Sequence, residues 1–203
     1  MRVASGARRV RPARATAVLA AAVLAAALAL AGCGGGNRAA SAPATFTWLH
    51  PSAAAPAGWA TATLSSGTAT LAYPRGWRRL QSDSGTVSAA SVARNGLIVG
   101  YLNATPRQAN ETLSNWSTFR PTHNFKEGDR GVRVLSSATG LRFAHGRGSC
   151  VEDTYHTVRA HYREVACLVD GARGQSVVVA AATTPAWARM QGTLRQAVSA
   201  FQA

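Results

Sequence analysis

Apolar and polar residues alternate with a two-residue period over residues 60–64 and 68–73, which is the pattern of half-buried β-strands, and further strand-like stretches follow from residue 86 onward. Asn95-Gly96 lies between two such stretches and predicts a hairpin, because both residues tolerate a positive φ. The stretch 176–182 lacks polar alternation, as expected of a strand covered on both faces. The predicted strands are residues 60–64, 68–73, 86–94, 97–102, 132–137, 141–145, 150–157, 161–169 and 176–182.

A helical period of three to four residues occurs in two places. The first helix is predicted to start at Thr105, which acts as the N-cap, with Pro106 in the first turn and Gln108 closing a capping box. We expect this helix to end before Pro121. Its apolar stripe consists of Ala109, Leu113, Trp116 and Phe119, and the polar loop expected after it runs through His123, Lys126 and Asp129.

A second helix is predicted from Thr184-Pro185 to the C-terminal end of the chain. Its apolar residues recur at steps of three and four, and they are Trp187, Met190, Leu194, Val198 and Phe201. Two helices and these strands, joined mainly by hairpins, predict an α+β domain in which the helices pack on an antiparallel sheet of about seven strands.

The first 32 residues have the charge pattern of a secretory signal. Five arginines and no acidic residue precede residue 15, and residues 15–32 carry no charge. The arginines stay on the anionic cytoplasmic face while the apolar run enters the bilayer. The run is only eighteen residues long and is mostly alanine, so we expect it to be cleaved rather than kept as a transmembrane anchor.

Leu30-Ala31-Gly32-Cys33 ends this segment and resembles the lipobox of bacterial lipoproteins. The resemblance implies that the Cys33 sulfur carries a diacylglyceryl group, that cleavage falls between Gly32 and Cys33, and that Cys33 becomes the N-terminus. Such a protein is a lipoprotein held at the cell membrane by its lipid, on the extracytoplasmic face. The alternative is an ordinary signal or an uncleaved anchor in which Cys33 is incidental.

Three segments follow from these patterns: a signal peptide over residues 1–32, a lipidated N-terminus and flexible tether over 33–58, and a single extracytoplasmic domain over 59–203. Gly, Ala, Ser and Pro dominate the tether. It contains one apolar island, Phe46 to Leu49, which we expect to dock on the folded domain; the alternative is that it lies in the membrane interface.

The chain remains basic without its signal, with 17 of the 22 Lys and Arg residues against 8 acidic ones. Lys126 is the only lysine, and an exported protein meets little nucleic acid, so we expect no nucleic-acid partner. A solvated basic surface is the first interpretation. Attraction to anionic lipid or to a wall polymer is the alternative.

Cys150 and Cys167 are the pair that remains once Cys33 is assigned to lipid. A hairpin that turns around Val158-Arg159 places them directly opposite each other, where Cβ atoms lie about 4.5–5.5 Å apart and a disulfide can form. An exported compartment permits the oxidation. The sequence therefore predicts a Cys150–Cys167 disulfide, with two free buried thiols as the alternative.

The opening hairpin ends in Tyr73-Pro74-Arg75-Gly76-Trp77. Here the chain resembles the PsbP-like family, including bacterial lipoproteins of the LpqN type, in which a strand leads into Tyr-Pro-x-Gly-Trp or a variant near the domain start. The resemblance implies a central antiparallel sheet flanked by helices. It also implies a family used mostly for binding or assembly, with no catalytic motif to carry over.

Catalytic motifs are not found: the sequence has no Gly-x-Ser-x-Gly, Walker, His-Glu-x-x-His or dinucleotide pattern. The strongest ionisable cluster is Glu152, Asp153, His156 and His161. The predicted hairpin opposes the two histidines, but two imidazoles without a third ligand make a weak metal site, so we expect neither metal nor cofactor. It also opposes Asp153 and Glu164, which is costly unless an arginine is near, and this favours a departure from the ideal pairing.

A ligand groove is possible at the end of the first predicted helix, lined by Trp116, Phe119, Arg120 and His123; the alternative is that the aromatic residues belong to the core. The leading hypothesis is a non-catalytic, lipid-anchored extracytoplasmic protein that binds an envelope protein or ligand. One alternative is a metal-dependent or hydrolytic enzyme that uses the acid and histidine cluster. Another is a basic module that associates with anionic lipid or wall polymer.

Overall fold

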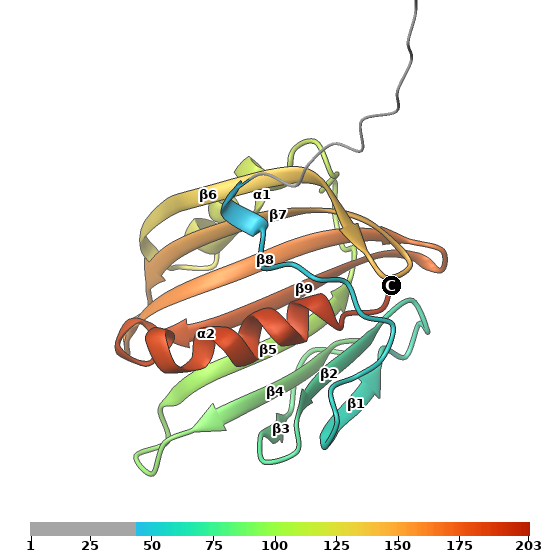
Figure 1. The fold of residues 1–203 in the computed structure, drawn as a ribbon. Coiled ribbons are helices and arrows are strands. Elements are labelled where there is room, and N and C mark those ends of the chain that lie inside the picture. The colour runs from blue at the N-terminus through green and yellow to red at the C-terminus, as the bar shows by residue number, and fades with distance from the viewer. Residues whose placement is uncertain (1–43) are drawn as a thin grey trace, which may run out of the picture. The chain divides into compact units, whose positions relative to one another are not determined.

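The strands of the second half of the chain form the centre of the fold in a computed structural model, which describes residues 44–203. The signal peptide, the cleavage site at Gly32 and Cys33, and the first part of the predicted tether lie outside the described residues. Seven antiparallel strands form one sheet in the order β3-β4-β5-β9-β8-β7-β6 (Figure 1). They are β3 (Arg78–Leu80), β4 (Val87–Val92), β5 (Ile98–Pro106), β6 (Arg130–Phe143), β7 (Gly146–His156), β8 (His161–Gly171) and β9 (Gly174–Thr183).

Two helices flank this sheet, and a separate hairpin lies beside it. The helices are α1 (Trp116–Lys126) and α2 (Thr184–Ser199), and the hairpin consists of β1 (Trp59–Thr63) and β2 (Thr70–Pro74). A short 3-10 helix, η1 (Ala44–Phe46), opens the described chain. The α+β class, with a sheet of about seven strands and two main helices, is confirmed.

The two helices cover opposite faces of the sheet, as Figure 1 shows with α2 in front and α1 behind. Side chains of a strand alternate between the faces, so Cys167 packs in the cluster that contains α2, while Leu168 packs in the cluster that contains Trp116 of α1. Strands β8 and β9 lie at the centre. Residues 176–183 of β9 are therefore all buried, which explains the absence of polar alternation there.

The hairpin of β7 and β8 has the predicted register. Cys150 pairs with Cys167 and His156 with His161, and the two cysteines form the predicted disulfide. The expectation that repulsion between Asp153 and Glu164 would shift this pairing is wrong, because these two residues do lie opposite each other. The arginine that makes this possible comes from α1 and is described below.

The first helix does not begin where the sequence predicts. Residues Thr105 and Pro106 extend β5 and pair with β9, and the N–H of Arg107 donates to the carbonyl oxygen of Gln175. The predicted start is thus an extended segment, because pairing along β9 outweighs the local capping signal. The helix begins eleven residues later, at Trp116.

The segment that follows also differs from expectation. Pro121 lies inside α1 rather than after it, and His123 and Lys126 are helical rather than part of a loop. A carboxylate shapes the chain before the helix: Glu111 accepts hydrogen bonds from the backbone N–H groups of Gln108 and Ala109. These bonds satisfy the amides that the predicted helix would have used.

Strand β6 is one strand of 14 residues, whereas the sequence suggests two separate strands over 132–137 and 141–145. Its pairing with β7 shifts at three points, and one shift lies between Ala138 and Leu141. Gly140 has a φ of 71° there, a conformation that glycine adopts without strain. The irregularity explains why the sequence pattern breaks although the strand continues.

The N-terminal end of the described chain packs on the domain. Phe46 is fully buried, and Trp48 and Leu49 pack against the same core as α2, so the predicted docking of the apolar island is confirmed. The folded part therefore includes residues 44–58, which the sequence assigns to the tether. Among the described residues, no helix has the length and apolarity needed to cross a membrane.

Candidate functional site

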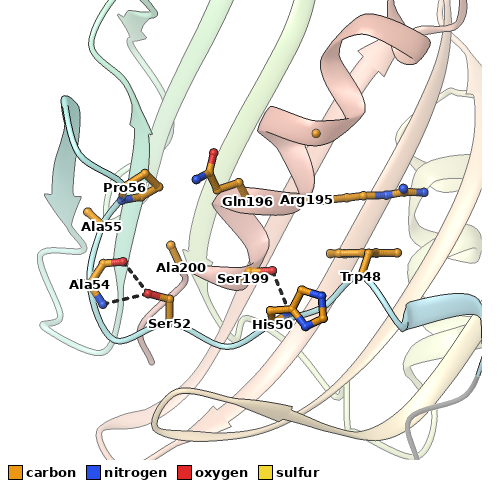
Figure 2. Close-up of a pocket in the computed structure, with 11 residues that line it drawn as sticks. Trp48, His50, Ser52, Ala54, Ala55, Pro56, Arg195, Gln196, Ser199 and Ala200 are labelled. Carbon is orange, nitrogen blue, oxygen red and sulfur yellow. Dashed lines mark hydrogen bonds between the residues drawn. The ribbon is translucent and has the colours of Figure 1, made fainter.

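A groove lies between the N-terminal segment and α2, and its volume is about 520 Å³ (Figure 2). This volume falls within the roughly 300–1,000 Å³ of small-molecule sites. One wall belongs to residues 48–56 and the other to the outer side of α2. The lining residues are Trp48, His50, Ser52, Ala54, Ala55, Pro56, Gly192, Arg195, Gln196, Ser199 and Ala200.

Helical spacing produces the α2 wall. Gly192, Gln196 and Ser199 recur at steps of four and three residues and so share one side of the helix, while Leu194 and Val198 are buried against the sheet. Gly192 has no side chain, and a Cβ built at this position meets no atom within 4 Å. The groove is open at this point of the helix.

Backbone hydrogen bonds hold the other wall in place. The N–H of Ser52 donates to the carbonyl oxygen of Ser199 at 2.9 Å, and the N–H of His50 donates to the Ser199 hydroxyl at 3.3 Å. The Gln202 side chain donates to the carbonyl oxygen of Ala53 at 2.8 Å. The irregular segment is thus fixed by the C-terminal end of α2, about 150 residues later in the chain.

The two ends of the groove differ in chemistry. The Arg195 guanidinium lies over the Trp48 ring, 5.2 Å from its centroid, and Figure 2 shows it extending away from Pro56. Such a cation–π contact contributes about 0.5–2 kcal/mol. Alanine and proline residues at 54–56 form the opposite, apolar end.

Charge in the groove is not balanced by the chain itself. The Nε of Arg195 and the Nε1 of Trp48 are buried, and neither has a hydrogen-bond partner within the described range. None of the residues that line the groove is acidic. The groove therefore offers a cation that no acidic side chain of the described residues pairs with, beside an apolar surface.

Sequence reasoning did not identify this site, because its walls come from segments about 140 residues apart. The apolar island of residues 46–49 was a partial signal, since it led to the expectation of docking. Nothing in the spacing of α2 indicated which segment would lie against Gly192 and Gln196.

The predicted binding residues of α1 lie together on the opposite face of the sheet. Trp116, Phe119, Arg120 and His123 all line one small cavity of about 70 Å³. Trp116 is buried and its Nε1 donates to the carbonyl oxygen of Ala166 at 2.9 Å, while Phe119 stacks between the rings of Trp116 and His123. Trp116 and Phe119 pack against the sheet, as the core alternative expected, and Phe119 and His123 also line a second cavity of about 190 Å³ on α1.

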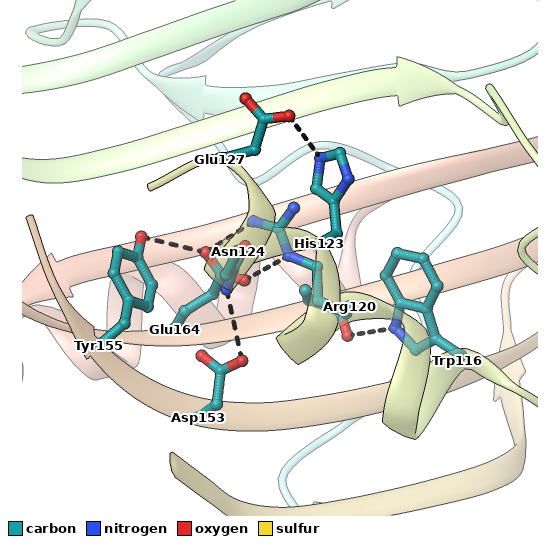
Figure 3. Close-up of polar contacts among 9 residues, drawn as sticks. Trp116, Arg120, His123, Asn124, Glu127, Asp153, Tyr155 and Glu164 are labelled. Atoms are coloured by element: carbon teal, nitrogen blue, oxygen red, sulfur yellow. Dashed lines mark hydrogen bonds and ion pairs between the residues drawn. The ribbon is translucent and has the colours of Figure 1, made fainter. Parts of the chain in front are cut away.

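A buried polar network underlies α1 (Figure 3). Arg120 donates from Nε and Nη2 to the two carboxylate oxygens of Glu164, at 2.7 and 2.9 Å, and the Tyr155 hydroxyl donates to the same carboxylate at 3.2 Å. Asn124 donates to Asp153 at 3.5 Å. Burial and the nearby negative charge of Glu164 raise the pKa of Asp153 to about 8.

This network resolves the opposition of Asp153 and Glu164 in the hairpin. Arg120 neutralises Glu164, and the raised pKa keeps Asp153 largely protonated near neutral pH, so the two groups do not carry like charges side by side. Burial also raises the pKa of Tyr155 well above its usual value. The network acts as an attachment of α1 rather than as an open site.

The predicted acid and histidine cluster is divided between the two faces of the sheet. Glu152 faces the α2 side, where it pairs with Arg163 at 2.7 Å, while Asp153 faces α1. The rings of His156 and His161 do lie together, with centroids 5.0 Å apart. Among residues 44–203, no three His, Cys, Asp or Glu side chains are placed to hold a metal ion.

Comparison with solved structures identifies the fold of this chain, whereas comparison by sequence finds no relative. No family model matches this chain, and no curated protein matches it by sequence. The solution structure of cyanobacterial PsbP (CyanoP) from Synechocystis sp. PCC 6803 has a TM-score of 0.52 and 14% identity, over 72% of this chain and 93% of that chain. LpqN, described as involved in cell envelope biogenesis of Mycobacterium tuberculosis, has a TM-score of 0.41 and 14% identity, over 66% of this chain and 82% of that chain. The described part of this chain thus has the PsbP-like fold.

Proposed function

We propose that this chain is a non-catalytic lipoprotein, anchored by lipid at Cys33 on the extracytoplasmic face of the cell membrane, whose single domain binds a partner or ligand of the cell envelope. The observation that carries the binding role is the groove between residues 48–56 and α2. It is open, partly apolar and lined by a cation that no carboxylate of the described chain pairs with.

The location is supported by the order of features along the sequence. An arginine-rich start, an uncharged run and Leu30-Ala31-Gly32-Cys33 precede the folded domain in the sequence. A disulfide joins Cys150 and Cys167, and disulfides persist in oxidising, exported compartments. An extracytoplasmic envelope role agrees with each of these features.

The non-catalytic part of the proposal rests on how the acidic side chains are used. Glu152 and Glu164 are each held by an arginine, and Asp153 is fully buried beneath α1. General acid or base catalysis needs a group within hydrogen-bond reach of a bound substrate. These three carboxyl groups serve packing and attachment instead.

A groove-filling variant tests the binding role. Gly192→Phe adds a ring at a position where a Cβ meets no atom within 4 Å, so the ring should project into the groove and block it. Ala188→Phe is the matched control, because it adds the same ring to an exposed position one turn earlier on the same helix, outside the groove. Both variants are expressed as full chains in the native envelope and compared with the unmodified chain by crosslinking and mass spectrometry.

We expect the unmodified chain and Ala188→Phe to give the same crosslinked species, and Gly192→Phe to lose at least one of them. Thermal unfolding should show that Gly192→Phe remains folded, because replacing glycine within a helix does not weaken it. Identical crosslinks for all three chains would contradict binding in this groove.

A further inference from the structure

We propose that the groove binds an anionic amphiphile, a small molecule with one carboxylate or phosphate group and an apolar body. The anionic group would lie at Arg195, beside Trp48, and the apolar body would lie along residues 54–56. This assignment deepens the proposed function and rests on it, since it names the chemical class that the groove would accept.

No acidic side chain of residues 44–203 pairs with the cationic end of the groove. All eight acidic residues of the sequence lie within residues 44–203, and none of them lines the groove. The ion pairs formed in this range use Arg120, His123 and Arg163, and none uses Arg195. A guanidinium presents a planar set of donors that matches a carboxylate or a phosphate, so an anion is the chemical class that would satisfy it.

Stacking on Trp48 prepares Arg195 for this role. The 5.2 Å contact holds the guanidinium against a partly buried indole, which limits the orientations that the side chain can adopt. A donor that is already oriented loses less conformational entropy when a ligand binds. His50 lines the same groove beside Trp48 and adds a polar group at this end, whereas the Gln196 amide points toward Pro56 (Figure 2).

The remaining wall selects for an apolar body. Ala54, Ala55 and Pro56 form one side, and Gly192 and Ala200 contribute small surfaces from α2. A free inorganic anion would leave this surface exposed to water, whereas an alkyl chain would cover it. An uncharged alkyl compound would in turn leave Arg195 without an acceptor. The combination of the two ends therefore points to a molecule that has both parts.

Titration with short-chain probes tests the assignment. The full chain is held in phosphatidylcholine nanodiscs and titrated by calorimetry with octyl phosphate, octanoate, octanol and inorganic phosphate, with empty nanodiscs as the blank. We expect saturable binding of at least one of the two anionic amphiphiles. Octanol and inorganic phosphate should bind at least tenfold more weakly, because each supplies only one of the two parts.

Paired variants locate the binding. Arg195→Met keeps an unbranched apolar stem but removes the charge, and should weaken binding of the anionic probe at least tenfold. Arg189→Met removes one charge from an exposed position of the same helix outside the groove, and should leave binding unchanged. Gly192→Phe should abolish binding of both anionic probes, while circular dichroism shows that the variant is folded.

Several results would overturn the assignment. Octanol that binds as tightly as octyl phosphate would show a purely apolar site, and inorganic phosphate that binds as tightly would show a simple anion site. Equal losses in Arg195→Met and Arg189→Met would show non-specific charge attraction. If no probe binds but Gly192→Phe still removes an envelope crosslink, the ligand class is wrong and the proposed function stands. If both experiments fail, both proposals are wrong.

Discussion

Asp153 and Glu164 show how a single arginine allows two carboxyl groups to face each other inside the protein. They lie opposite on β7 and β8, and Asp153 is fully buried. Arg120 binds Glu164 through two hydrogen bonds, which leaves Asp153 without a cation of its own. Burial together with the charge of Glu164 then raises the pKa of Asp153 to about 8, so the group is neutral over most of the neutral range.

The raised pKa predicts a loss of stability as pH rises. In the unfolded chain Asp153 releases its proton near pH 4, whereas in the folded chain it keeps the proton until about pH 8. Between these values the folded state binds more protons than the unfolded state, so the free energy of unfolding falls with increasing pH and levels off above about pH 8.

Asp153→Asn should remove this dependence, because an amide does not titrate. We expect the variant to exceed the unmodified chain in stability by at least about 1.4 kcal/mol at pH 8, the equivalent of one pKa unit, and by less at pH 5. Urea unfolding at both pH values measures the difference. Parallel pH profiles for the two chains would show that Asp153 does not carry the raised pKa.

Arg120 is predicted to matter mainly because it neutralises a buried charge. Arg120→Met leaves the Glu164 carboxylate, whose side chain is only 1% exposed, without a cation, and should lower the free energy of unfolding by about 3–5 kcal/mol. The double variant Arg120→Met, Glu164→Met replaces the pair by apolar groups and should recover much of this loss. Urea unfolding of both variants is the measurement, and strictly additive losses would contradict the interpretation.

Among the secondary-structure elements, the β7–β8 hairpin could be predicted with its register. A two-residue turn at 158–159 and two cysteines at equal distances from it define one pairing, and the structure has that pairing. The local information was sufficient because a hairpin is built from neighbouring residues. Arg163 is adjacent to Glu164 in sequence, faces the opposite side of the sheet and pairs with Glu152.

The disulfide in this hairpin should stabilise the domain through the loop that it closes. Cys150 and Cys167 are 17 residues apart, and a closed loop of this length contributes roughly 3 kcal/mol by the chain-entropy model. The double variant Cys150→Ala, Cys167→Ala should lose about this amount in urea unfolding. Reduction of the unmodified chain with dithiothreitol should give a similar loss, and unchanged stability in both cases would contradict the prediction.

The start of the first helix could not be predicted from local signals, although part of its predicted apolar stripe does pack on the sheet. Trp116 and Phe119 do pack on the sheet from one side of α1. The capping pattern at Thr105 has the form of a helix start, but the backbone of Thr105 pairs with Val177 of β9, which is 72 residues later in the chain. Long-range strand pairing of this kind overrides local propensity and leaves no local trace in the sequence.

At the scale of the whole molecule, the candidate groove forms because α2, near the C-terminal end of the chain, packs beside residues 48–56. Backbone groups of residues 50–53 form hydrogen bonds with Ser199 and Gln202, at and just after the end of α2, and Phe46 is fully buried. Neither wall has a pattern that identifies it as a binding surface. The sequence could therefore predict that the island docks, and could not predict the site that docking creates.

The docked segment is predicted to be part of the stable fold rather than a loose attachment. Phe46 is fully buried, so Phe46→Ala should lower the free energy of unfolding by about 3–5 kcal/mol, from lost burial and the cavity that remains. Chemical denaturation of the full chain measures the loss. A change of less than about 1 kcal/mol would show that the segment is only weakly attached.

Intact-mass spectrometry of the protein isolated from its native membrane tests the proposed location most directly, because lipid on Cys33 determines where the domain works. We expect a chain of residues 33–203 that carries a diacylglyceryl group, and we expect Cys33→Ala to lose the acyl mass. Residues 1–32 still attached, or an N-terminus at residue 33 without acyl mass, would contradict the proposal of a lipid-anchored envelope protein.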